Sequence, residues 1–123
     1  MTDQFRGTYT VMVTAFDTEG RVDLEAQARF TDWQVREGIH GLIPLGSTGE
    51  FLSMSPEERR DVAECVIDTV AGRVPVLIGA GAESTDDVID NVRMAEELGA
   101  DGTMIIPPFY STPTWDELIN HFG

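Results

Sequence analysis

The stretch GSTGE at residues 46–50 lies between an apolar run at residues 41–45 (GLIPL) and a helix-start signal at residues 55–58 (SPEE). The apolar run shows no alternation with polar residues, which is typical of a strand buried on both faces of a parallel sheet. Serine followed by proline, with glutamate three positions after the serine, is the signature of a helix N-terminus. The stretch is therefore predicted to be a loop that joins a buried strand to a helix, as in parallel α/β proteins.

The same strand, loop and helix pattern recurs along the chain. Strands are expected at residues 8–15, 41–45, 74–79 and 102–106, and helices at residues 23–38, 55–72, 85–98 and from 114 onward. The strand starts recur at intervals of about 30 residues, which is the length of a βα unit. Two architectures remain open on this pattern: a doubly wound sheet, and part of a barrel whose complete form needs about 250 residues and eight units. Residues 1–123 are expected to form a single domain.

The composition excludes several classes of partner. The chain has 22 acidic residues and 8 basic ones, all of them arginine, for a formal net charge of -14. Nucleic acid and anionic membranes both require a basic patch, so neither is an expected partner. Acidic excess without any lysine predicts a halophilic, salt-adapted protein, because salt screens the self-repulsion. No apolar run approaches the length of a membrane span and the N-terminus is polar, so a cytoplasmic location is expected.

The loop at residues 46–50 is the first candidate binding site. Its two glycines are expected to adopt positive φ and to let the backbone approach a ligand closely. Successive N–H groups and the hydroxyls of Ser47 and Thr48 would present donors to a small anion such as a carboxylate. The same residues are also typical of a tight turn with no binding role, and both interpretations stay open at this point.

A second candidate is Tyr110, in the loop at residues 107–113 (PPFYSTP). It follows the fourth expected strand, and its hydroxyl is suited to proton relay. The alternative is an aromatic residue that packs with its hydroxyl toward solvent. The segment at residues 79–84 (GAGAES) resembles a dinucleotide fingerprint only weakly, because its sixth position is serine and it follows the third strand. We interpret it as a flexible βα loop.

The remaining reactive side chains are poor catalytic candidates. The single cysteine, Cys65, lies on the helical pattern of residues 55–72 and is expected to be a core residue. His40 precedes a strand and so belongs to the face opposite the loops, while His121 lies on the last helix. No cofactor or metal site is predicted.

Four motifs together resemble the dihydrodipicolinate synthase and N-acetylneuraminate lyase family. They are residues 13–16 (VTAF), 46–51 (GSTGEF), 55–59 (SPEER) and 107–110 (PPFY). The resemblance spans essentially the whole chain. Members are (β/α)8 barrels that act as class I aldolases or lyases, in which a lysine on the sixth strand forms a Schiff base with pyruvate or another 2-keto acid. The resemblance implies that this α/β chain is about the first half of such a barrel, ending within its fourth helix.

The resemblance also assigns residue roles. It implies that Ser47 and Thr48 bind the carboxylate of the 2-keto acid, with Ser47 also in a relay of hydroxyl groups. Tyr110 matches the relay tyrosine, which in this family reaches into the neighbouring subunit's site across a tight dimer interface. A homo-oligomer, dimer or tetramer, is therefore expected for the full-length form. A hydroxyl relay moves protons without adding charge to the site.

The departures from the family decide what this chain can do alone. The Schiff-base lysine, the second relay tyrosine and a nearby arginine belong to the part of the barrel beyond residue 123, and the chain contains no lysine. It is therefore expected to be inactive alone. Position 47 is serine, where synthases of the family usually have threonine, and this difference favours the lyase and less-defined subgroups. The identity of the aldehyde partner stays open. The alternative function is a non-catalytic half-barrel module that associates with another chain through its open sheet edges.

Overall fold

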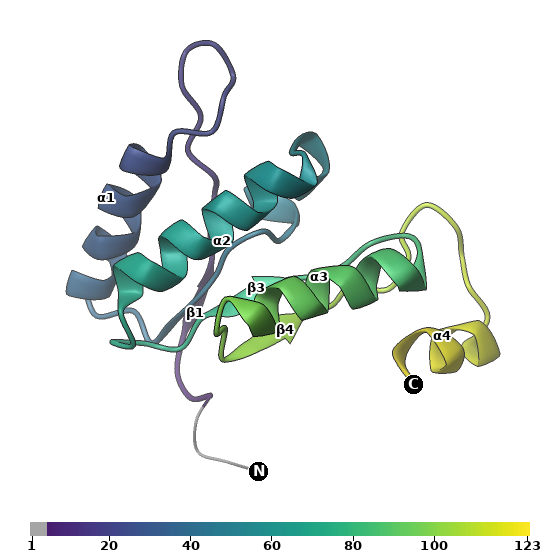
Figure 1. Cartoon of the computed structure of the whole chain (residues 1–123). Helices are drawn as coiled ribbons and strands as arrows, with labels where there is room; N and C mark the ends of the chain where they lie inside the picture. The colour runs from purple at the N-terminus through teal and green to yellow at the C-terminus, as the bar shows by residue number, and fades with distance from the viewer. Residues whose placement is uncertain (1–4) are drawn as a thin grey trace.

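The computed structural model describes residues 5–123, in which four β-strands alternate with four α-helices (Figure 1). The strands are β1 (Tyr9–Val11), β2 (Gly41–Ile43), β3 (Leu77–Gly79) and β4 (Gly102–Met104). The helices are α1 (Leu24–Arg36), α2 (Pro56–Val70), α3 (Thr85–Glu97) and α4 (Trp115–Phe122). Every expected strand and helix is present. The strands are shorter than the sequence pattern predicts. Within the described residues, no helix is long and apolar enough to cross a membrane.

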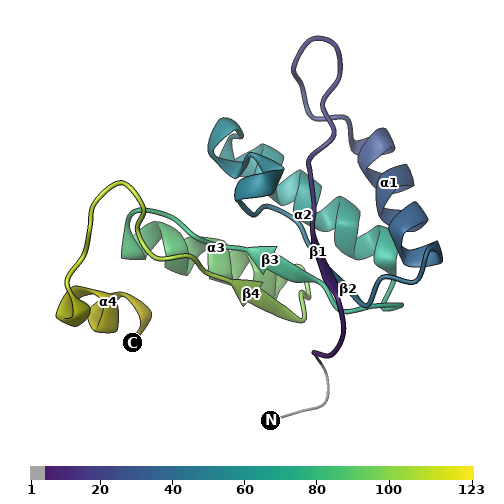
Figure 2. The same cartoon turned by 180° about the vertical axis from the view of Figure 1, so that it is seen from behind.

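The strands follow one another in chain order and all run parallel. β1 pairs with β2, and β3 pairs with β4. A bridge between Leu42 and Val76 joins the two pairs, where the Leu42 N–H donates to Pro75 O at 3.0 Å and the Gly79 N–H to Pro44 O at 2.9 Å. Helices α1, α2 and α3 lie on one side of the strands, as the views from front and back show (Figures 1 and 2). Sequential parallel strands with helices on one face form part of a barrel, whereas a doubly wound sheet is covered on both faces.

The core lies between the strands and α2. Leu42 and Ile78 are fully buried, and α2 contributes the buried stripe of Val62, Val66 and Val70. Each of these side chains gains about 1.5–3 kcal/mol when it leaves water. The spacing of apolar residues in the sequence predicts this stripe. The stripe packs against the strands whose ends carry the candidate loops.

Helix α1 buries polar residues, which its sequence pattern did not indicate. Its buried side chains are Gln27, Thr31 and Gln34, whereas Trp33 is 55% exposed. Gln27 Oε1 accepts the Ala15 N–H at 2.8 Å, so this amide continues the hydrogen bonding of β1 beyond its end. A buried polar group with a partner is tolerated in a core. Gln27 therefore ties α1 to the segment that follows β1, in addition to the apolar packing of Phe30 and Val35 against the core.

The prediction that Cys65 belongs to the core is only partly met. Its side chain is half-buried between α2 and α1, and its Sγ lies 3.4 Å from Leu24 O. Burial is the main cause that raises the pKa of the Cys65 thiol. A thiol with a raised pKa is a poor nucleophile at neutral pH, so a structural role fits this residue.

Capping boxes begin α2 and α4, as the sequence predicts. At α4 the Thr114 N–H donates to Glu117 Oε2 at 2.7 Å, and the Glu117 N–H donates back to Thr114 Oγ1 at 3.4 Å. Hydrogen bonding from the Thr114 backbone, and then from its hydroxyl, lowers the pKa of Glu117. The last helix therefore begins at a defined residue although it carries no buried side chain.

This cap predicts a pH-dependent start of α4. Because the folded-state pKa of Glu117 is lowered, its contribution is complete above the unfolded-state pKa and is lost as the pH falls through the folded value. We expect the Thr114 amide proton shift, followed by NMR, to titrate with Glu117 in acid. Glu117→Gln is the control and should remove that transition. An identical acid titration of Thr114 in the variant would contradict the assignment.

Candidate active site

The loop after β2 is built from two 3₁₀ turns, Ser47–Gly49 and Phe51–Ser53. The expectation that its glycines adopt positive φ is wrong. Leu45 (φ 62°) and Glu50 (φ 57°) take the left-handed conformation, whereas Gly46 has φ -78°. A Cβ at position 46 would lie 2.9 Å from Val11 Cγ1, so any larger residue there would force the Val11 side chain to shift. The glycine thus brings the loop against β1 rather than providing an unusual backbone angle.

Ser47 and Thr48 are exposed at the end of the buried strand β2. Within residues 5–123 neither hydroxyl makes a hydrogen bond, so both are available as donors to a ligand. The turn is closed by hydrogen bonds from Gly49 N–H to Gly46 O at 2.9 Å and from Glu50 N–H to Ser47 O at 3.1 Å. Two available hydroxyls on a fixed turn form a small donor site suited to a carboxylate.

Thr14, which lies beyond the end of β1, fixes this turn. Its Oγ1 donates to Gly49 O at 2.7 Å, across 35 positions in sequence. Thr14 is part of the VTAF motif, and the sequence alone predicts no role for it. A hydroxyl near the C-terminal end of the first expected strand, at the same end of the sheet as the loop after the second, was the available signal. We assign Thr14 a positioning role, because it contacts the loop backbone and not the exposed donors.

Tyr110 is held by its backbone, and its side chain is 93% exposed. The N–H groups of Phe109 and Tyr110 both donate to Glu83 Oε1, at 2.7 and 2.8 Å. Glu83 belongs to the segment at residues 79–84, which was interpreted as a flexible loop. The segment is a βα loop between β3 and α3, as expected, and its Glu83 carboxylate also anchors the tyrosine loop. Charge-assisted hydrogen bonds of this kind are about twice as strong as neutral ones.

An aromatic contact joins the two candidate loops. The rings of Phe51 and Phe109 meet edge to face, with centroids 6.3 Å apart and an angle of 90° between planes. Phe51 directly follows the donor loop and Phe109 directly precedes Tyr110. The structure therefore brings together the segments that carry the predicted residues. The Tyr110 hydroxyl itself makes no hydrogen bond to any residue of the described chain.

The two histidines lie in different places: His40 is remote from these loops, whereas His121 lines a hollow together with Pro108 and Ser111 of the tyrosine loop. His40 Nδ1 accepts the Thr8 N–H at 3.0 Å at the start of the strands, on the face opposite the loops as predicted. His121 Nδ1 lies 2.8 Å from Thr85 Oγ1, where α4 meets α3. Among residues 5–123, no cluster of three or more histidine, cysteine, aspartate or glutamate side chains is arranged to hold a metal ion.

Comparison with known proteins places the whole chain in one group. Residues 4–123 match the Dihydrodipicolinate synthetase family. A 4-hydroxy-tetrahydrodipicolinate synthase of Nitratidesulfovibrio vulgaris is 46% identical over 119 residues, which are 97% of this chain and 40% of that protein. The solved structure of YagE from E. coli K12 in complex with pyruvate is 37% identical, with a TM-score of 0.91 over 96% of this chain and 40% of that one.

A second pyruvate complex gives the same result. The chloride-inhibited dihydrodipicolinate synthase from Acinetobacter baumannii, complexed with pyruvate, is 31% identical with a TM-score of 0.92. It is matched over 94% of this chain and 40% of its own. The chain thus spans about 40% of the length of the relatives it matches. Its parallel strands follow one another in chain order, with the helices on one side and the candidate loops at the strand ends, and so form part of a (β/α)8 barrel. The chain belongs to the Dihydrodipicolinate synthetase family.

Proposed function

We propose that this chain is the N-terminal part of a class I aldolase or lyase that acts on pyruvate or another 2-keto acid. The observation that carries the proposal is the pair of exposed, unbonded hydroxyls of Ser47 and Thr48 on a fixed turn at the end of β2. Two relatives that match over nearly the whole chain were solved with pyruvate bound. In this proposal the Schiff-base lysine belongs to the part of the barrel beyond residue 123.

In the proposed site, Ser47 and Thr48 donate hydrogen bonds to the carboxylate of the 2-keto acid. These hydroxyls are neutral, so they bind the carboxylate without a positively charged side chain beside it. Hydrogen bonds to an ionised acceptor are short and strong. Thr14 keeps the turn in place through Gly49 O. The bound carboxylate then fixes the position of the 2-keto carbon, which an amine from the rest of the barrel attacks.

Tyr110 has the second role in the proposal. Its ring is almost fully in solvent, yet its backbone is anchored by Glu83. A rigidly held, exposed phenol is suited to act in a site formed with a neighbouring subunit, so the full-length enzyme is proposed to be a homo-oligomer. Ser47 connects the carboxylate site to the hydroxyl relay, through which protons reach or leave the reacting carbonyl.

A chimera tests the carboxylate assignment. It joins residues 1–123 to the remaining C-terminal part of the Nitratidesulfovibrio vulgaris synthase, which is 46% identical over the shared part. Thr48→Val keeps the side-chain shape and removes one donor, so pyruvate binding is expected to weaken by about 1–3 kcal/mol. Single-turnover kinetics are needed, because the Michaelis constant equals a dissociation constant only when chemistry is slow.

Thr48→Ser is the matched control for this test. It keeps the hydroxyl, so its dissociation constant for pyruvate should stay within about threefold of the parent chimera's. A change of that size is smaller than the effect of losing one hydrogen bond. Equal binding by the valine and serine variants would show that the Thr48 hydroxyl does not contact the carboxylate.

A further inference from the structure

The tyrosine loop, residues 107–113, belongs to no helix or strand, so its position depends on contacts with other segments. Its first two residues are prolines, which have no N–H to donate. The next two amides, those of Phe109 and Tyr110, both donate to Glu83 Oε1, at 2.7 and 2.8 Å. Hydrogen bonds to a carboxylate are stronger than those to a neutral acceptor. One carboxylate oxygen thus fixes two consecutive peptide groups, and the second of them carries the Tyr110 side chain.

The position of Glu83 is itself fixed by the helix that begins beside it. Ser84 is the N-cap of α3, and its Oγ accepts the Asp87 N–H at 3.1 Å. On the N-terminal side of Glu83, the Asn91 side chain donates from Nδ2 to Ala80 O at 3.3 Å. Glu83 therefore lies between two points of the backbone that α3 holds in place.

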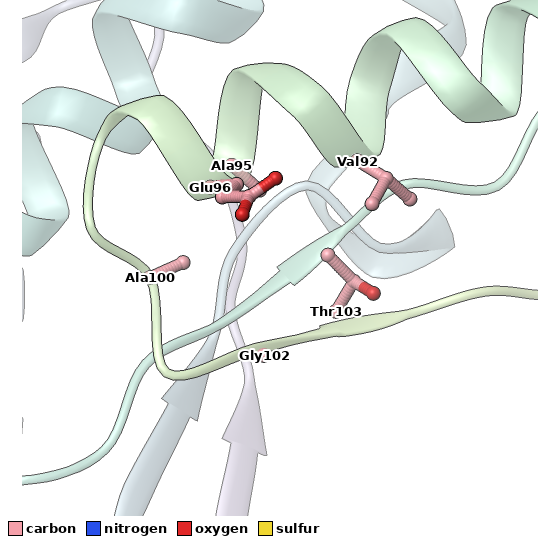
Figure 3. Close-up of a pocket in the computed structure, with 6 residues that line it drawn as sticks. All are labelled: Val92, Ala95, Glu96, Ala100, Gly102 and Thr103. Carbon is pink, nitrogen blue, oxygen red and sulfur yellow. The ribbon is translucent and has the colours of Figure 1, made fainter.

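Helix α3 is packed beside the strand that leads into the tyrosine loop. Ala95 of this helix is fully buried. Figure 3 shows α3 running alongside β4, with Val92 of the helix and Thr103 of the strand lining the hollow between them. The loop after β3 also passes close to the chain beyond β4, because a Cβ at Gly81 would lie 2.6 Å from Ile106 Cγ1. Packing therefore sets the position of this loop, and of its carboxylate, relative to the end of β4.

We propose that Glu83 is a positioning residue for the hydroxyl relay, which fixes the Tyr110 phenol for proton transfer by binding the Tyr110 amide. The inference rests on the proposed relay role of Tyr110. Glu83 contacts the backbone of the tyrosine and not the reacting atoms, so it acts through Tyr110. A displacement of about 1 Å in a catalytic group can lower a rate by about a hundredfold. Loss of Glu83 should therefore affect turnover, whereas carboxylate binding, which is assigned to Ser47 and Thr48, should be retained.

A second contact of the same loop makes this effect selective. The edge-to-face contact between the rings of Phe51 and Phe109 does not involve Glu83. It keeps the tyrosine loop beside the donor loop when the carboxylate is removed. Without Glu83, the Phe109 ring should stay packed while the Tyr110 peptide group loses its acceptor. The expected change is in the orientation of Tyr110 and not in the fold.

Kinetics of the chimera test the proposal. Glu83→Ala removes the acceptor and should lower turnover by about tenfold to a hundredfold. Its dissociation constant for pyruvate, from single-turnover kinetics, should stay within about threefold of the parent's. Glu83→Gln keeps an oxygen acceptor and should recover most of the lost turnover. Asp86→Ala is the matched control, because it removes an exposed carboxylate from the first turn of α3 and leaves Glu83 in place. Its turnover should equal that of the parent.

A double variant separates this inference from the relay assignment. If Glu83 acts through the Tyr110 hydroxyl, Glu83→Ala should lower turnover by less than about twofold in a chimera that already carries Tyr110→Phe. An equal loss in both backgrounds overturns the positioning role. So does parental turnover of Glu83→Ala beside an impaired Tyr110→Phe, and in that case the relay stands. Parental turnover of Tyr110→Phe refutes the relay, and the positioning role with it.

The amide proton shifts of Phe109 and Tyr110 in the 123-residue chain, followed by NMR, give a reading that does not depend on activity. Loss of the carboxylate acceptor in Glu83→Ala should move both signals upfield, while Asp86→Ala should leave them in place. Unchanged signals in Glu83→Ala would overturn the proposal. Should Glu83→Ala lose the helical circular dichroism signal of the parent, Glu83→Asp replaces it in every comparison with the same expected results, because its carboxylate is one methylene group short of the two amides.

Discussion

Tyr110→Phe, introduced into the chimera, is expected to lower turnover by about 10²–10⁴-fold, the range for loss of one proton-transfer group. The substitution keeps the ring and removes only the hydroxyl. Substrate affinity should change much less, because the proposed relay acts on protons and not on the carboxylate. Steady-state and single-turnover kinetics with pyruvate separate the two effects.

Tyr9→Phe is the matched control for the relay assignment. The Tyr9 hydroxyl is buried and has no hydrogen-bond partner among the described residues, so its removal costs little. It should leave turnover unchanged. If Tyr110→Phe also keeps turnover within about threefold of the parent, Tyr110 is a packing residue and not part of a relay.

Gly79→Ala is expected to destabilise the barrel by about 3 kcal/mol or more, at the upper end of the range for overpacking. A Cβ at position 79 would lie 2.2 Å from Leu45 O and 2.8 Å from Gly46 N. These are backbone atoms of the segment that leads into the donor loop, so they cannot turn aside as a side chain would. The strands must separate, and the loop that carries Ser47 must move with them. Urea unfolding of the chimera measures the loss.

Ile78→Val is the control for this prediction. Ile78 is fully buried in the same strand, and loss of one methyl group there should cost about 0.5–1.5 kcal/mol. Gly79→Ala should also weaken pyruvate binding, whereas Ile78→Val should not. A smaller destabilisation by Gly79→Ala than by Ile78→Val would mean that β2 and β3 do not approach as closely as the structure has them.

Local patterns were sufficient to predict the order of the elements. The apolar runs, the two capping boxes and the stripe of Val62, Val66 and Val70 each depend on residues a few positions apart, and the structure contains all of them. The architecture needed more, because the βα spacing alone is compatible with a doubly wound sheet. Only the sequential strand order and the one-sided helices select the barrel.

The site shows why contacts between distant segments were missed. Glu83 binds amides 26 and 27 positions later, and Thr14 binds a carbonyl 35 positions later, so no local pattern marks either residue. The glycines of the donor loop were predicted to provide positive φ, but the constraint on Gly46 comes from a side chain of β1. Buried Gln27 was unpredictable for the same reason, since its partner is the backbone of residue 15.

The most direct test of the central claim is borohydride trapping with pyruvate, followed by peptide mass mapping, on the chain alone and on the chimera. We expect the 123-residue chain to form no adduct at any side chain, because it contains no lysine. The chimera should be trapped at one lysine of its C-terminal part, and replacing both Ser47 and Thr48 by alanine should strongly reduce that adduct. A stoichiometric adduct at an internal residue of the 123-residue chain would contradict the account. So would an adduct yield in the chimera that stays the same after both hydroxyls are removed.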